Sequence, residues 1–203
     1  MNIAAFCVSE MDGQQLFVLD REIVSASIGR GVNLDACRLA LSLAAERDIK
    51  FQVAGADRVP LGSAESLSDY TPWGTYSAFS GRAVALFESF GVQKDQFTRV
   101  WIDVEPSMPA YFFTPTTTVG GVIFEQSQFH SVLPLAPPLP FRPNLIALKQ
   151  AKSDIAPMFF VDVPGYDQIF PEVFCAMEIC EAWIKRGFVG ALFRDVEIQA
   201  TPQ

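Results

Sequence analysis

Hydrophobic and polar positions follow the clearest pattern near the C-terminus, between residues 158 and 198. A short apolar run over 158–163, closed by a Pro-Gly pair, is typical of a buried strand that ends in a turn. From Pro171 onward, apolar side chains recur every three or four residues, which predicts an amphipathic helix with Gly187 at its end. A return strand follows, so this stretch predicts a strand-helix-strand unit.

The patterns earlier in the chain are shorter and predict a mixture of strands and helices. Two β-rich runs at 2–8 and 15–19 flank an Asp-Gly pair, which is a strong signal for a hairpin. Ser80 is a candidate N-cap for a helix over 81–90, with Gly91 as its stop. The other predicted elements are a helix over 34–47 and strands over 50–53, 99–105, 111–114, 119–124 and 144–148.

The stretch over residues 55–80 is rich in Gly, Ser and Pro, which predicts a loop and a boundary inside the chain. We therefore expect a small N-terminal lobe over 1–75 and a second lobe over 76–203, packed together as one unit. Because strands and helices do not alternate strictly, the predicted fold class is α+β, with a mixed or antiparallel sheet and a few packed helices.

Composition and charge narrow the range of partners. Half of the 203 residues are hydrophobic and 12% are aromatic, which is enough for a full core without a disulfide or metal staple. The formal net charge is −8, whereas affinity for nucleic-acid phosphates comes largely from Lys and Arg. We therefore expect no nucleic-acid partner; an acidic surface suits solubility or a basic protein partner.

The cysteines and the N-terminus indicate a reducing compartment. Cys7, Cys37, Cys175 and Cys180 form no C-x-x-C pair, so we expect all four to be reduced and predict neither a metal site nor a cofactor. The N-terminus lacks the basic segment of a signal peptide, and no apolar window is long enough for a membrane span. These features predict a cytoplasmic protein without membrane insertion.

One segment of the predicted loop is a candidate binding surface. The sequence DYTPWGTY places Asp69, Tyr70, Trp73 and Tyr76 among turn residues, and Trp and Tyr are common anchors of protein interfaces. The alternative is that these aromatic rings fold back and fill a junction between the lobes. In that case the proline-rich stretch over 133–143, predicted as an irregular connector, is the next candidate surface.

Candidate catalytic residues are few. His130 is the single histidine, so any Ser-His or Cys-His mechanism depends on it. Asp103 and Glu105 form one orderly pair of carboxylates, but such pairs are common on solvated strands. The chain contains neither a G-x-S-x-G elbow nor a phosphate-binding glycine motif. We therefore predict no enzyme, and a small hydrolase that uses His130 with a carboxylate stays open as an alternative.

Three stretches of the chain resemble a bacterial immunity-protein group called immunity protein eleven. They are FSGRAVALFESFGVQKDQF, AYFFTPTTTVGGVIFEQSQF and MFFVDVPGYDQIFPEVFCAMEICEAWIKRGFVGALF, which together cover roughly residues 75–195. The resemblance is one of pattern more than of diagnostic residues. One departure is Gly120-Gly121, which stand near the place where the group has acidic residues.

What this resemblance implies is binding. Members of the group accompany polymorphic or type VI secreted toxins and act as stoichiometric inhibitors, without chemistry of their own. We therefore expect a protein that neutralises a cognate toxin or effector encoded next to it. A generic adaptor or chaperone that uses the aromatic loop and the proline-rich stretch is a further alternative.

Overall fold

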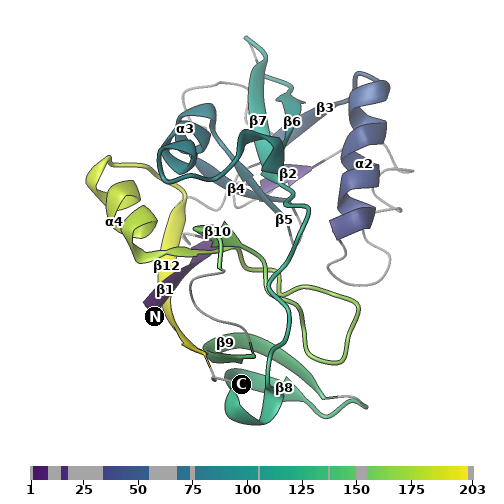
Figure 1. The fold of residues 1–203 in the computed structure, drawn as a ribbon. Coiled ribbons are helices and arrows are strands. Elements are labelled where there is room, and N and C mark those ends of the chain that lie inside the picture. Colours follow the sequence, from purple (N-terminus) through teal and green to yellow (C-terminus); the bar gives the residue numbers. More distant parts are fainter. Residues whose placement is uncertain are drawn as a thin grey trace.

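The structure is a computed structural model that describes residues 2–8, 15–17, 34–54, 68–73, 76–104, 106–136, 138–149 and 155–200. In this part of the chain, three α-helices accompany two six-stranded sheets, and each sheet mixes parallel with antiparallel pairs. The fold class is therefore α+β, as predicted. Figure 1 shows one sheet above the other, with α2 beside the upper sheet and α3 and α4 close together at one side.

The elements carry the labels of Figure 1. The α-helices are α2 (Leu34–Glu46), α3 (Gly81–Ser89) and α4 (Met177–Lys185), and two short 3-10 helices are η3 (Lys94–Gln96) and η4 (Phe124–Gln126). The strands are β1 (Asn2–Val8), β2 (Gln15–Phe17), β3 (Lys50–Ala54), β4 (Tyr70–Trp73), β5 (Tyr76–Phe79), β6 (Phe97–Ile102), β7 (Met108–Phe113), β8 (Gln128–Leu133), β9 (Leu139–Leu148), β10 (Met158–Phe159), β11 (Phe174–Ala176) and β12 (Ala191–Ala200).

The terminal sheet, which contains β1 and β12, has the strand order β10-β11-β1-β12-β9-β8. β1 runs antiparallel to both of its neighbours, and β12 runs parallel to β9. Side chains alternate between the faces of a strand. Ala4 and Phe6 therefore face a larger core, whereas Ile3 and Ala5 face a smaller one. Burial on both faces explains why β1 is a nearly continuous apolar run.

The middle sheet has the strand order β2-β3-β6-β7-β5-β4. Its helix α3 connects β5 to β6 and begins where the sequence predicts, because the Ser80 hydroxyl oxygen accepts a hydrogen bond from the Ala83 N–H at 3.2 Å. The helix ends before Gly91, whose φ of +87° is easily reached only by glycine. The predicted helix over 34–47 and strand over 50–53 are also confirmed, as α2 and β3.

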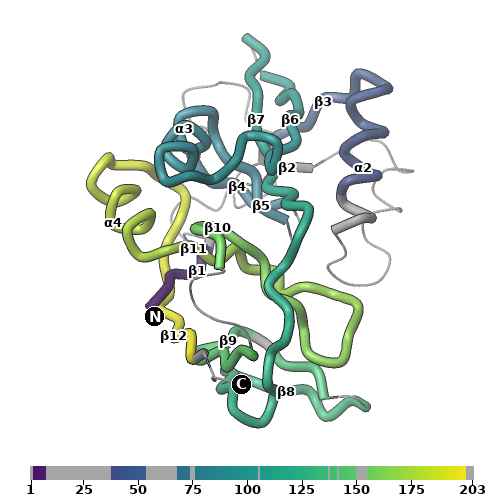
Figure 2. Tube along the Cα trace, viewed as in Figure 1, coloured from purple at the N-terminus to yellow at the C-terminus, as the bar shows by residue number. Residues whose placement is uncertain are grey.

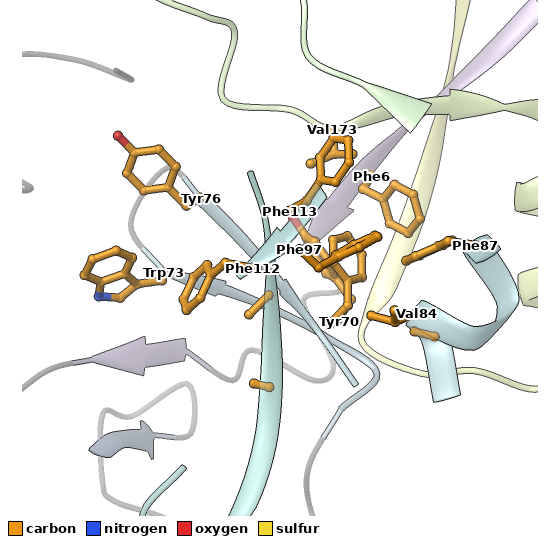
Figure 3. Close-up of a cluster of buried hydrophobic side chains, with 14 of the residues drawn as sticks. Phe6, Tyr70, Trp73, Tyr76, Val84, Phe87, Phe97, Phe112, Phe113 and Val173 are labelled. Atoms are coloured by element: carbon orange, nitrogen blue, oxygen red, sulfur yellow. The ribbon is translucent and has the colours of Figure 1, made fainter. Parts of the chain in front are cut away.

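The larger core joins the two sheets. The ring of Phe6 on β1 lies 5.3 Å from that of Phe79 on β5 and 5.4 Å from that of Trp183 on α4, measured between centroids. Figure 3 shows Phe6 facing Phe87 of α3 within the same cluster. Since β1 belongs to the terminal sheet whereas β2 and β3 belong to the middle sheet, the boundary predicted at residue 75 does not coincide with the division between the sheets.

The opening hairpin that the sequence predicts is not formed. β1 and β2 lie in different sheets, since β1 pairs with β11 and β12 while β2 pairs with β3. The Asp-Gly pair between them lies outside the described residues. A turn signal acts locally, whereas strand pairing follows burial. A strand that is apolar on both faces is most stable in the interior of a sheet, which is where β1 lies.

The C-terminal strand-helix-strand unit is present as β11, α4 and β12, but its helix begins later than predicted. The prediction started the helix at Pro171, whereas α4 begins at Met177. Phe174 instead pairs with Ala5 and Phe159 in the terminal sheet. A short apolar run fits a helix or a strand equally well by its pattern, so long-range pairing decided between them.

Two further segments differ from the sequence prediction. The predicted strand over 119–124 forms only isolated bridges, at Val119 and Val122, and then η4. The predicted connector over 133–143 is largely a hairpin, because β8 runs to its start and Pro140 and Pro143 lie on β9 opposite β8. The predicted strands over 99–105, 111–114 and 144–148 are confirmed in their main parts as β6, β7 and β9.

Candidate functional site

The structure brings the four predicted partner-binding residues together, but in a hairpin and not in a loop. Asp69 directly precedes β4, Tyr70 and Trp73 lie on β4, and Tyr76 lies on β5. All four are buried. The expectation of a surface loop is therefore wrong at these positions, because the hairpin forms one edge of the middle sheet and its aromatic side chains fill the larger core.

The aromatic rings of this hairpin pack against other rings. The Trp73 centroid lies 5.4 Å from that of Phe51 and 5.3 Å from that of Phe112, and Figure 3 shows Trp73 and Phe112 side by side. The Tyr70 hydroxyl accepts a hydrogen bond from Ser77 Oγ at 3.2 Å, and burial raises the pKa of Tyr70 to about 12. This packing supports the alternative of a filled junction. Partner binding by these rings stays a prediction, and their burial argues against it.

Asp69 is the polar centre of the region. Its carboxylate accepts two hydrogen bonds from Arg82 at 2.5 Å, Nε to Oδ1 and Nη2 to Oδ2, and one from Ser80 Oγ at 2.7 Å. The Val189 N–H donates a fourth, at 3.0 Å. The Asp69 N–H donates to the Val189 carbonyl, and the Ser80 N–H donates to the Asp69 carbonyl, each at 3.0 Å. One side chain thus joins β4, the start of α3 and the turn between α4 and β12.

The charge of Asp69 is compensated where it lies. Burial by itself raises the pKa of the carboxyl, but the hydrogen bonds from Arg82, Val189 and Ser80 together outweigh burial and hold that pKa below its ordinary value of 3.8. The side chain of Asp69 is 2% exposed and that of Arg82 is 60% exposed. The buried carboxylate of Asp69 therefore holds the guanidinium of Arg82 in place at the surface.

A glycine allows the turn before β12 to approach Asp69. Gly190 has a φ of +94°, and a Cβ atom placed on it would lie 2.5 Å from Ser68 Cβ and 2.5 Å from the Tyr70 carbonyl oxygen. Both the backbone angle and the space exclude a side chain here. This close contact is what brings the backbone of Val189 within hydrogen-bond distance of the carboxylate.

Arg82 is held in one orientation from two sides. Asp69 binds its inner edge, and its guanidinium carbon lies 4.7 Å from the centroid of the Phe188 ring. A guanidinium over an aromatic face is attracted by the negative charge density of that face. Among the described residues, Nη1 of Arg82 has no hydrogen-bond partner, so the outer edge of the guanidinium is open to a ligand.

Arg82 borders a surface pocket with a volume of about 370 Å³. Its walls come from β4, β5, β6, β7 and the start of α3. Thr71 pairs with Ala78, and Ala78 pairs with Phe112, which is two residues from Ala110. Paired residues share a face of the sheet, as do residues two apart, so Thr71, Ala78 and Ala110 project together. The small alanine side chains leave a hollow that larger residues would fill.

A hairpin arm, residues 128–136 and 138–143, lies at the opposite end of the molecule from the middle sheet. It consists of β8 and the first half of β9, and it stands at the lower end of Figures 1 and 2. β8 is the edge of the terminal sheet and, among the described residues, pairs only with β9. Val132, Leu133 and Leu135 are 43%, 44% and 52% exposed. The arm is therefore an exposed apolar surface beside an open strand edge.

The sequence contained a signal for this arm that the predictions missed. No Asp, Glu, Lys or Arg occurs between residues 126 and 141, in a chain of which 19% is charged. Edge strands are usually protected by charged residues or proline, and β8 contains neither. The prolines of β9 suggested a connector, because proline does not donate hydrogen bonds to a sheet. The absence of charged residues between 126 and 141 was therefore more informative than the prolines.

A second ion pair, in which Arg194 is 25% and Glu172 11% exposed, fixes the base of the arm. Glu172 Oε1 accepts a hydrogen bond from Arg194 Nη2 at 2.8 Å, and Arg194 also donates to the carbonyl of Pro143 on β9. Burial raises the pKa of Glu172, although the Arg194 charge opposes the shift. The pair therefore connects the residues before β11 with β12 and with the root of the arm.

The groups that the hydrolase alternative needs are not assembled in the described part of the chain. His130 is exposed on β8, and no hydrogen bond or ion pair there joins it to a carboxylate. Asp103 is exposed, and Glu105 lies outside the described residues. The same residues contain no cluster of three or more His, Cys, Asp or Glu side chains able to hold a metal ion. The described cysteines, all without a disulfide, are Cys7, Cys175 and Cys180.

No family model matches the chain, and no curated protein matches it significantly in sequence. Within the described ranges, none of the helices has the length and apolarity needed to cross a membrane.

Proposed function

We propose that this chain is an immunity-type protein that binds and neutralises a cognate bacterial toxin by direct contact. The observation that carries the proposal is the β8–β9 arm, whose edge strand β8 has no Asp, Glu, Lys or Arg and which exposes the apolar residues Val132, Leu133 and Leu135. The resemblance of residues 75–195 to immunity proteins supports the class of partner. We propose the arm as the contact surface in place of the buried hairpin around Trp73.

The arm has the chemistry of a surface that is covered by another protein. An open strand edge binds an added strand through main-chain hydrogen bonds, and the alternating side chains then supply specificity. Val132 and Leu133 project to opposite faces of β8, so a partner that grips the edge buries at least one of them. Between residues 128 and 141, no charged side chain of the arm has to lose its hydration on binding.

The net charge of the molecule suits the same role. A formal charge of −8 attracts a basic partner over distances longer than direct contact and speeds the encounter at low salt. The proposed partner is a toxin or effector with a basic surface, encoded next to this chain, and we place the encounter in the cytoplasm.

The proposal is tested by co-expressing a tagged form of this chain with the product of the neighbouring gene. We expect the two proteins to purify together and the chain to restore growth to cells that express the toxin. Absence of a complex, with both proteins folded, contradicts the immunity function.

The contact surface is tested with variants of matched exposure. Val132→Asp and Leu135→Asp should each raise the dissociation constant on the order of thirtyfold, because about 2 kcal/mol is typical for an apolar anchor in an interface. Leu39→Asp, at an apolar position on α2 that is 58% exposed, should leave binding unchanged. Loss of binding in the α2 variant with intact binding in the arm variants would place the interface elsewhere while leaving the function itself in place.

A further inference from the structure

The pocket beside Arg82 lies outside the surface that we propose for toxin binding. Its volume of about 370 Å³ lies within the range of about 300–1,000 Å³ typical of small-molecule sites. It lies in the middle sheet, whereas the arm extends from the terminal sheet. The two sites are therefore separate.

One end of the pocket is suited to an anion. Arg82 lines it and keeps the Nη1 edge of its guanidinium without a partner among the described residues, as shown above. The nearby Asp69 does not repel an anion strongly, because its two carboxylate oxygens already accept four hydrogen bonds. A guanidinium binds a carboxylate through charge-assisted hydrogen bonds.

A second donor lies inside the pocket. Thr71 is 7% exposed and lines the pocket, yet its hydroxyl makes no hydrogen bond to any residue that the structure describes. Its strand register places it on the same face as Ala78, which also lines the pocket. Because Thr71 lines the pocket, its hydroxyl can donate a hydrogen bond to a ligand that lies there.

The remaining surface of the pocket is apolar. Ala78 and Ala110 form its floor, and Ile102 and Met108, which pair with each other across β6 and β7, form one side. Such a surface favours a hydrocarbon body of a few carbon atoms over a polar one. The pocket thus combines a cationic end with an apolar floor.

We infer that this pocket binds a small amphipathic carboxylate, with the carboxylate held by Arg82 and Thr71 and the hydrocarbon chain over Ala78, Ala110 and Met108. The inference does not rest on the proposed function, because it involves no residue of the arm. It assigns a class of ligand to Arg82, the exposed partner in the ion pair with Asp69.

The test uses octanoate as the probe and octan-1-ol as its uncharged counterpart, each titrated into the full chain by calorimetry and by NMR of the methyl groups. We expect saturable binding of octanoate at millimolar concentration, with shifts of the Ala78, Ala110 and Met108 methyl signals, and binding of octan-1-ol weaker by about tenfold or more. Equal binding of the two probes, or no saturable binding of octanoate, overturns the inference.

Variants locate the probe. Arg82→Gln should remove the preference for octanoate, whereas Arg99→Gln, at an exposed arginine that also lies over an aromatic ring, should keep it. Arg82→Gln also removes the positive charge that compensates Asp69 and so can destabilise the fold. Two variants that leave the ion pair intact are therefore measured as well. Thr71→Val should weaken octanoate binding by roughly threefold to tenfold, and Met108→Trp should abolish it by filling the pocket. Unchanged octanoate binding in Met108→Trp places the probe outside this pocket and rejects the site.

Discussion

At the scale of single residues, Asp69 shows how the same side chain takes a different role once its surroundings are known. As part of a predicted loop it is an acid at the rim of an interface. In the structure it is a buried anion with four hydrogen bonds, and it joins the start of β4 to α3 and to the turn before β12. The same aspartate therefore stabilises the fold, and the exposed group of the pair is Arg82.

The first prediction concerns the stability that Asp69 contributes. Asp69→Asn should lower the free energy of unfolding at pH 7 by on the order of 3 kcal/mol, because hydrogen bonds to a charged group contribute about 1.5–3 kcal/mol each and several are weakened together. Asp103→Asn, at an exposed acid, should change stability by less than about 0.5 kcal/mol. Urea unfolding measures both variants, and equal small effects would contradict the role of Asp69.

The stabilisation by Asp69 also depends on pH in a definite direction. The pKa of Asp69 in the folded chain is lower than its ordinary value, so the unfolded state binds a proton first as the pH falls. The contribution is complete above about pH 4, near the ordinary pKa of Asp, and disappears as the pH falls through the lowered pKa. The difference in stability between the natural chain and Asp69→Asn should therefore shrink below about pH 4. A difference that grows on acidification would reverse the assigned shift.

The second prediction compares two glycines that share a backbone conformation. Gly190 and Gly91 have φ angles of +94° and +87°, but an added Cβ atom meets Ser68 and Tyr70 at 2.5 Å in the first case and nothing within 4 Å in the second. Gly91→Ala should cost about 1–2 kcal/mol, the strain of the left-handed conformation alone. Gly190→Ala should cost clearly more, because the backbone must also move. Equal shifts in the urea midpoint would show that the contact is not tight.

At the scale of elements, α4 and β11 connect the two cores. Trp183 on α4 is buried in the larger core, and Phe174 on β11 is buried in the smaller one, where its ring lies 5.8 Å from that of Phe159. The periodicity of the sequence indicated that both residues are apolar anchors. It placed both on one helix, because only pairing with β1 shows that Phe174 belongs to a strand.

The third prediction follows from this burial. Trp183→Ala and Phe174→Ala should each lower the free energy of unfolding by about 3–5 kcal/mol, as large-to-small changes in a core do. Glu178→Ala, on the exposed face of α4, should have an effect below about 0.5 kcal/mol. Denaturant titrations of the three variants measure the contrast. Similar midpoints for all three would mean that the assigned face of α4 is wrong.

At the scale of the whole molecule, two sheets share one core. Phe6 of the terminal sheet contacts Phe79 of the middle sheet and Trp183 of α4. Strands from before residue 75 lie in both sheets, since β1 belongs to one and β3 to the other. An interface made of buried aromatic rings couples the parts that it joins, because neither sheet can open without exposing them to water.

The fourth prediction is a single cooperative unfolding transition. Trp73 reports on the middle sheet and Trp183 on α4, so fluorescence of single-tryptophan variants, in which Phe replaces the other tryptophans, follows two regions separately. Their midpoints in urea should coincide with each other and with the loss of far-ultraviolet circular dichroism. Two separate transitions would show that the lobes unfold independently.

The amino-acid sequence by itself determined the features that depend on neighbours along the chain. The cap at Ser80 and the stop at Gly91 set the ends of α3, the alternation of apolar residues identified most of β6, and a strand was predicted over the second half of β9. The α+β class also follows from such local patterns. These features are governed by hydrogen bonds and backbone angles within a few residues, which is why they could be predicted.

Only the tertiary structure decided which strands pair, which aromatic rings are buried and which surface is left exposed. β1 pairs with β11 and β12, far away in the sequence, and Asp69 meets Val189 across 120 positions. The segment around Trp73 is a buried hairpin where the sequence predicted an exposed loop, and the proline-containing stretch is an exposed hairpin where the sequence predicted an irregular connector. Aromatic and proline residues fit either setting locally, and the choice follows from the free energy of burying apolar surface from distant segments together.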